Sequence, residues 1–130
     1  MPFTLALLPG DFIICRLPAE APFPDWARGE NLLALIRTAD ELSVVCEETD
    51  ELPDDVRVEG DWRALKVGGP LDFSLVGVLA ELTGALAQAG VSIFALSTFD
   101  TDYLLVKSAD LPDACEALNQ AGHQIDLPSS

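Results

Sequence analysis

Apolar and polar positions alternate in short blocks along this chain and predict a mixed α+β protein. Residues 62–67 have the pattern of a strand, and a helical stripe follows. The apolar residues of the stripe recur at the spacing of one helix face: Leu75, Val78, Leu79, Leu82, Leu86 and Ala89. Ser74 is the expected N-cap of this helix, and Gly90 suits the position after its end. Gly84 within the helix indicates close packing onto a sheet.

The remainder of the second half continues with the same kinds of element. Residues 91–96 are almost continuously apolar, as in a strand buried on both faces, and residues 101–107 form the next strand. Asp110-Leu111-Pro112 opens a second helix, Gly122 closes it, and residues 124–127 form a short last strand. The order strand, helix, strand, strand, helix, strand is that of the ferredoxin-like fold.

The first half is less regular and lacks a long helical stripe. Four strands are expected in it, at residues 3–8, 11–17, 32–37 and 42–46. We therefore interpret the fold as α+β, with two ferredoxin-like (βαββαβ) units in tandem. The first unit, residues 1–60, is degenerate, and the second is residues 61–130.

Acidic residues dominate the charge of the chain and gather between the two halves. The 130 residues include 22 acidic and 7 basic side chains, for a formal net charge of −15. Nucleic acids and anionic membranes would repel such a chain, so we expect neither as a partner. Residues 48–60 are acidic, contain Pro53 and lack apolar periodicity, which predicts a solvated linker.

The N-terminal residues and the cysteines favour a cytoplasmic protein. The start of the chain lacks a basic signal region, and no apolar run approaches the ~20 residues that span a bilayer. Cys15, Cys46 and Cys115 are odd in number and widely spaced among apolar neighbours. We interpret them as buried free thiols, with a metal site or disulfide as the alternative. Trp26 and Trp62 are expected in the core or an interface.

Sequence motifs for catalysis are absent. His123 is the only histidine, and its place after Gly122 predicts an interaction with a helix dipole. The sequence has no nucleophile elbow, phosphate loop or dinucleotide-binding glycine pattern. Asp100 and Asp102 suit turn capping, and no further ligand run supports a Mg²⁺ or Ca²⁺ site beside them. We expect neither enzymatic activity, nor a cofactor, nor a metal.

The candidate binding site is a polar corner between two apolar strands, residues 93–107, together with a helix opened by glycine. A helix N-terminus favours a carboxylate, and a nearby aspartate can pair with an ammonium group. Gly77 would allow a ligand to approach the backbone closely, or would simply fit tight packing of the helix on the sheet. This arrangement suits a small zwitterion.

Several blocks of the chain resemble the ACT-domain family. They are Gly77-Val78-Leu79-Ala80, residues 89–93 and residues 97–106, and residues 35–45 fit as well. The resemblance covers residues 32–125 and is greatest to the tandem-ACT group, which includes the CASTOR arginine sensors and small bacterial proteins. ACT domains are ferredoxin-like regulatory modules that pair side by side and bind amino acids at the interface. The resemblance therefore implies a homodimeric sensor of an amino acid.

The same resemblance implies a ligand pocket built from three places. These are the approach to the first helix (Leu71, Asp72, Phe73, Gly77, Val78 and Leu79), the corner (Thr98, Phe99 and Asp102), and a neighbouring domain (Val91, Ser92 and Ile93). Leu75 stands where the arginine sensors have an acidic residue, and Asp72 where they have glycine, so arginine specificity is not implied. The alternative function is a protein–protein adaptor without a ligand, which would use the acidic surface of residues 47–61.

Overall fold

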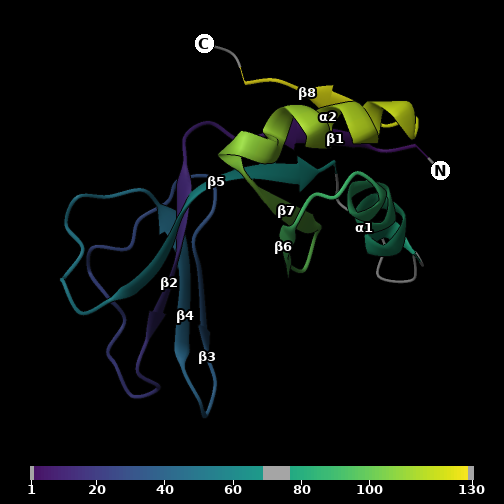
Figure 1. Cartoon of the computed structure of the whole chain (residues 1–130). Helices are drawn as coiled ribbons and strands as arrows, with labels where there is room; N and C mark the ends of the chain where they lie inside the picture. Colours follow the sequence, from purple (N-terminus) through teal and green to yellow (C-terminus); the bar gives the residue numbers. More distant parts are fainter. Residues whose placement is uncertain (1, 69–76, 129–130) are drawn as a thin grey trace. The chain divides into compact units, whose positions relative to one another are not determined.

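The chain forms two compact units, which a computed structural model describes for residues 2–68 and 77–128 (Figure 1). Met1–Pro9 and Arg63–Ser130 make one unit, here called the α/β unit. Gly10–Trp62 makes the other, here called the β unit. The expected division at residues 60 and 61 lies close to one of these boundaries. It is wrong for the first nine residues, which belong with the second half of the chain.

The α/β unit contains the complete ferredoxin-like set of elements and one additional strand. Its elements are β1 (Thr4–Leu7), β5 (Arg57–Val67, from Arg63 onward), α1 (Val78–Gln88), β6 (Ile93–Ser97), β7 (Asp102–Lys107), the 3₁₀ turn η1 (Ser108–Asp110), α2 (Leu111–Gln120) and β8 (Gln124–Asp126). The strand order is β8-β1-β5-β7-β6. β1 lies between β8 and β5, parallel to the former and antiparallel to the latter. The α+β, ferredoxin-like fold is thus confirmed.

β1 joins this sheet because its alternating side chains complete the apolar face beneath the helices. Leu5 lies opposite Val67, and Leu7 lies opposite Leu65, so these side chains point to the same face. They share one core with residues of both helices, among them Leu82, which is fully buried. Figure 1 shows α1 and α2 in the same unit, and the two helices contact each other.

Helix α1 begins later than its apolar stripe predicts. Its N-cap is Gly77, at a left-handed φ of 84°, whereas the expected cap, Ser74, lies outside the described residues. At the other end, Gly90 has a φ of 76° and follows the C-cap Ala89, as expected. Gly84 is exposed, and a Cβ atom added there would meet nothing within 4 Å. The predicted close packing of Gly84 onto a sheet is therefore wrong.

Gly84→Ala is expected to raise the free energy of unfolding by about 0.5–1 kcal/mol, because alanine restricts the unfolded chain and favours helix. Open space at the site means that the new methyl group causes no clash. Urea unfolding with matched m-values would measure the gain. A loss of stability would show that the helix surface near Gly84 is covered.

The β unit is an antiparallel sheet in the order β3-β4-β2-β5. Its strands are β2 (Phe12–Leu17), β3 (Ala34–Arg37), β4 (Leu42–Glu47) and the first part of β5. The four strands expected in the first half are confirmed to within about two residues, the accepted uncertainty of element ends. No helix occurs among residues 10–62, in agreement with a degenerate unit. The predicted linker is only partly correct, because residues 57–60 already belong to β5.

The three cysteines are free thiols, as expected, and two of them share a core. Cys15 on β2 and Cys46 on β4 pack in the apolar cluster of the β unit, and Cys115 on α2 is half-buried. Hydrogen bonding to Cys46, burial and charge repulsion raise the pKa of Cys15. Burial raises the pKa of Cys115.

Thiol labelling should follow this difference in burial. With an aromatic disulfide reagent near pH 7, Cys115 should react slowly, and its rate should rise as the pH passes above the ordinary value of 9.0, because the thiolate is the nucleophile. Cys15 and Cys46 should react only after denaturation, since both are buried in the folded chain. Rapid labelling of either buried thiol at neutral pH would contradict this packing.

Candidate functional site

Part of the expected ligand pocket falls outside the described residues. Leu71, Asp72 and Phe73 lie there, as does Leu75. The other nine expected site residues all belong to the α/β unit and can be placed. They form two groups, at opposite ends of α1.

The first group surrounds the N-terminus of α1. The backbone N–H of Glu81 donates to the carbonyl of Gly77 at 2.9 Å, which is the first helical hydrogen bond. The backbone N–H groups of the first turn of α1 have no acceptor within the helix. They lie at the positive end of the helix dipole. Gly77 has no side chain to cap them. Val78 is buried in the core and Leu79 packs against it, so both residues anchor this turn.

The corner between β6 and β7 is closed by two threonines. The backbone N–H of Thr98 donates to the carbonyl of Thr101 at 2.8 Å, and the N–H of Thr101 donates back to Thr98 Oγ1 at 3.3 Å. Thr101 Oγ1 donates to the carbonyl of Val67 at 2.7 Å. That bond is buried and ties the corner to the last residue of β5. Sequence reasoning missed the role of Thr101, although a threonine between two aspartates in a turn was a visible signal.

Asp102 faces the helical side of the sheet at the first position of β7. Residues two apart on a strand share a face, and Leu104 and Val106 lie in the core beneath the helices. Asp102 lies opposite Ser97 on β6, and its Oδ1 accepts the Ser97 hydroxyl proton at 2.6 Å. The carboxylate is thereby oriented and remains partly exposed.

The corner and the N-terminus of α1 lie at the same end of the α/β unit. Val67 ends β5, which leads through the segment outside the described residues to α1, and Thr101 is hydrogen-bonded to Val67. The corner also presents Phe99, whose side chain is 80% exposed. Exposed aromatic side chains are enriched in protein interfaces.

The second group lies at the far end of the helix. Val91, Ser92 and Ile93 follow the C-terminus of α1, so its 11 residues separate them from Gly77. At 1.5 Å per residue that distance is about 16 Å, longer than a free amino acid. Val91 is buried in the core, Ile93 packs against it and Ser92 is exposed. One α/β unit therefore does not unite the two groups, and only a neighbouring domain would bring Ser92 to the corner.

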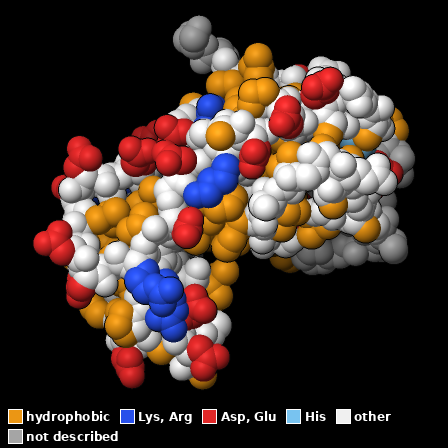
Figure 2. Space-filling view, viewed as in Figure 1, with side chains coloured by type: hydrophobic (Ala, Val, Ile, Leu, Met, Phe, Trp, Pro, Cys, Tyr) orange, Lys and Arg blue, Asp and Glu red, His pale blue; other side chains and the backbone are white. Residues whose placement is uncertain are grey.

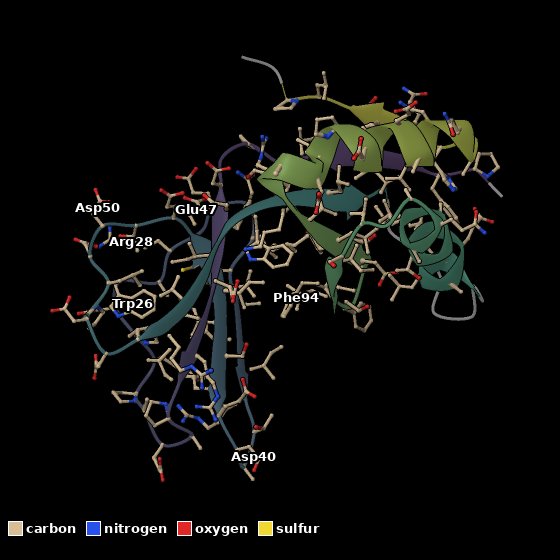
Figure 3. All side chains as sticks on the ribbon, viewed as in Figure 1. Trp26, Arg28, Asp40, Glu47, Asp50 and Phe94 are labelled. Atoms are coloured by element: carbon tan, nitrogen blue, oxygen red, sulfur yellow. The ribbon has the colours of Figure 1, made fainter. Side chains whose placement is uncertain are left out.

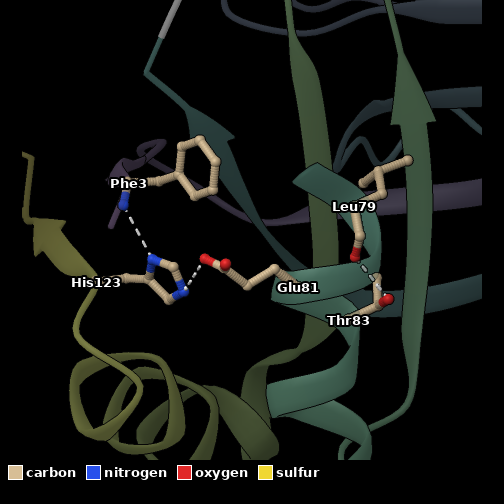
Figure 4. Close-up of polar contacts among 5 residues, drawn as sticks. All are labelled: Phe3, Leu79, Glu81, Thr83 and His123. Atoms are coloured by element: carbon tan, nitrogen blue, oxygen red, sulfur yellow. Dashed lines mark hydrogen bonds and ion pairs between the residues drawn. The ribbon is translucent and has the colours of Figure 1, made fainter. Parts of the chain in front are cut away.

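His123 follows the end of α2, as expected, and its side chain contacts Phe3 and Glu81 (Figure 4). Its Nδ1 accepts the backbone N–H of Phe3 at 2.9 Å, and its ring stacks on the Phe3 ring at 5.6 Å. On the other side of the ring, Nε2 is 3.3 Å from a Glu81 carboxylate oxygen. The buried ring thus joins the start of β1 to α1. Figure 4 also shows Thr83 Oγ1 donating to the Leu79 carbonyl at 2.6 Å.

Other kinds of site find no support in the described part of the chain. Residues 2–68 and 77–128 contain no group of three or more His, Cys, Asp or Glu side chains placed to hold a metal ion. None of the helices within these ranges has the length and apolar character needed to cross a membrane.

Comparisons with known proteins match both parts of the chain. The ACT domain family model matches residues 57–120, and a family described as an N-terminal domain matches residues 10–55. The human cytosolic arginine sensor for mTORC1 subunit 1 is 37% identical over 60 residues. That match covers 45% of this chain and only 18% of the sensor.

Solved structures show the same fold over larger shares of the chain. Protein Atu0741 of Agrobacterium tumefaciens is 39% identical with a TM-score of 0.91, and the match covers 100% of this chain and 96% of that one. Aspartate kinase of Clostridium acetobutylicum matches with a TM-score of 0.66 at 15% identity, over 85% of this chain and 32% of the kinase. The family model, the sensor and the shared fold agree with the resemblance found in the sequence. Residues 57–120 of the chain belong to the ACT-domain family.

Proposed function

We propose that this protein is a cytoplasmic regulator that binds a free amino acid at an interface between ACT domains of a homodimer. The observation that carries the proposal is that the N-terminus of α1, where Gly77 supplies no side-chain cap, and the corner with Asp102 belong to the same end of the α/β unit. The helix N-terminus suits the ligand carboxylate, and Asp102 suits its ammonium group. Leu71, Asp72 and Phe73 would complete this wall of the pocket.

The separation of the two groups of residues supports a shared pocket. Val91, Ser92 and Ile93 would come from the second domain, because the length of α1 keeps them from the corner of their own unit. Within the described residues β6 pairs only with β7, so it forms an edge that a second copy can extend. Phe99 would then shield the ligand from water at the interface. Ligand binding would favour the dimeric arrangement to which it binds more tightly.

A thermal-shift screen with the twenty amino acids tests the proposal. A ligand present at about 100 times its Kd stabilises the folded state by about 2.7 kcal/mol, which raises Tm by about 10 °C in a chain of this size. We expect one amino acid or a few related ones to give such a shift. No shift from any of them, in protein shown to be free of co-purified ligand, would overturn the proposal.

Asp102→Asn should lower the affinity for the amino acid found in that screen about 10- to 100-fold, because a hydrogen bond to a charged group contributes about 1.5–3 kcal/mol. Asparagine retains an oxygen that can accept the Ser97 hydroxyl, so the corner should stay folded. Asp100→Asn, two residues away in the exposed turn, is the matched control for charge. Calorimetric titration would measure all three proteins. Equal affinities would exclude Asp102 from the site.

The alternative, a ligand-free adaptor, is favoured by one feature of the surface. Several acidic side chains lie on the face of the molecule drawn in Figure 2. The exposed acidic residues include Glu48, Asp50, Glu51 and Asp54. A basic partner held by such a surface would dissociate as salt screens the charges, since the Debye length is about 8 Å at physiological ionic strength. Ligand binding in a pocket should depend much less on salt, which separates the two functions.

A further inference from the structure

The β unit has a surface hollow of its own, which the proposed amino-acid site does not use. Asp25, Trp26, Arg28 and Glu51 line it, and its volume is about 250 Å³. All four residues lie within Gly10–Trp62. Figure 3 shows Trp26 and Arg28 along the loop that precedes β3. Since pockets for drug-sized ligands start at about 300 Å³, this hollow suits a smaller molecule.

Backbone hydrogen bonds hold the walls of the hollow in place without a ligand. The N–H of Glu47 on β4 donates to the Arg28 carbonyl at 2.8 Å, and the N–H of Glu30 donates to the Glu47 carboxylate at 3.1 Å. The opposite wall is a turn in which the N–H of Glu51 donates to Thr49 Oγ1 at 3.1 Å. The Trp26 ring is packed in the core of the β unit. The residues that line the hollow are therefore held in place before a ligand binds.

The polar groups of this hollow remain open to a ligand. Among the described residues, the Arg28 guanidinium, the Trp26 indole N–H and the carboxylates of Asp25 and Glu51 form neither an ion pair nor a hydrogen bond. Arg28 therefore lies more than 4.0 Å from both carboxylates, the limit for an ion pair. An unpaired guanidinium is unusual in a chain with a net charge of −15, where acidic partners are abundant.

We propose that this hollow is a second binding site, for the zwitterionic part of a free amino acid. The Arg28 guanidinium would bind the carboxylate through paired N–H groups, and Asp25 and Glu51 would bind the ammonium group. The Trp26 indole would contribute an apolar surface and one N–H donor. The two carboxylates oppose a simple anion and Arg28 opposes a simple cation, so only a ligand with both charges satisfies every group.

Nuclear magnetic resonance of the full chain can test this site with defined probes. The probes are L-alanine, L-glutamine and L-leucine, with sodium acetate and methylammonium chloride as ligands that carry one charge each. We expect all three amino acids to shift the Trp26 indole N–H and the Arg28 side-chain signals in a saturable manner, and neither single-charge probe to do so at equal concentration. Shifts with acetate alone, or no saturable shift up to millimolar concentrations of the amino acids, would overturn the proposal.

Exposed residues provide variants that should not disturb folding. Arg28→Gln and Glu51→Gln should each weaken the effect of the amino acids on the Trp26 signal by tenfold or more. Arg57→Gln, which removes the same charge from another exposed position of the β unit, should leave the effect unchanged. Equal binding by Arg28→Gln and Arg57→Gln would exclude this site. Asp102→Asn should leave the Trp26 shifts intact. The proposal for this hollow and the proposal for the site at Asp102 can therefore be rejected independently of each other.

Discussion

Leu82→Ala is expected to lower the free energy of unfolding by about 3–5 kcal/mol, because it removes a fully buried side chain from the core of the α/β unit. Leu82 lies on α1 and packs in the cluster that contains Leu5, Leu65 and Leu104. Alanine preserves the helix propensity of the position, so the loss reflects the cavity alone. Urea unfolding followed by circular dichroism would measure it.

Leu127→Ala is the matched control for this change. Its side chain is 72% exposed, so the same truncation should alter stability by less than about 0.5 kcal/mol. Comparable losses in Leu82→Ala and Leu127→Ala would contradict the packing of α1 on the sheet. The same loss would be expected for Leu86→Ala, which is also fully buried on α1.

His123→Ala should lower the free energy of unfolding by about 1–3 kcal/mol, because it leaves the Phe3 N–H without its acceptor. Loss of the ring contact with Phe3 adds to this effect. The change also frees the start of β1, so amide exchange in residues 3–7 should accelerate more than in β5. This local response is a second measurement that distinguishes loss of the contact from general instability.

His123→Asn provides the comparison for the hydrogen bond. The side-chain oxygen of asparagine can occupy nearly the position of Nδ1 and accept the Phe3 N–H. We expect Asn to retain a measurable part of the stability that Ala loses. Identical losses in the two variants would show that the acceptor contributes nothing and that ring packing accounts for the whole effect.

Local patterns were sufficient to predict the elements of the fold. Short apolar runs predicted β2, β4 and β7, and proline and glycine correctly marked the two ends of α2. The sheet to which β1 belongs could not be predicted in this way. An alternating strand such as Thr4–Leu7 suits any sheet with one covered face, and its pairing with β5 joins residues about sixty positions apart.

The start of α1 and the role of Gly84 show a second limit of the sequence. Apolar spacing extends back to Leu75, but α1 begins at Val78, after Gly77 in its left-handed conformation. Glycine within a helix suggested close packing, whereas Gly84 lies on the open face. A glycine is compatible with both situations, and only the position of its neighbours distinguishes them.

Residues of the candidate site could be selected from the sequence where the residue type itself suggests a role in binding. They could not be selected where the role depends on a contact between distant parts of the chain. Asp102, Thr98 and Gly77 could be selected from the sequence, and the structure places them at one end of the α/β unit. The buried bond from Thr101 to Val67, which fixes the corner, depends on a contact between distant strands. The hollow of the β unit was also invisible, because Arg28 and Glu51 approach each other only through the folding of two loops.

Hydrogen–deuterium exchange with and without an equimolar mixture of the twenty amino acids tests the central claim most directly. Amino-acid binding at the ACT site predicts slower amide exchange in residues 77–80, 91–93 and 98–102, and Asp102→Asn should reduce this protection. Slower exchange confined to residues 25–51 would indicate the second site alone. Unchanged exchange at the corner and at the N-terminus of α1 would contradict the assignment of this protein as a sensor of amino acids.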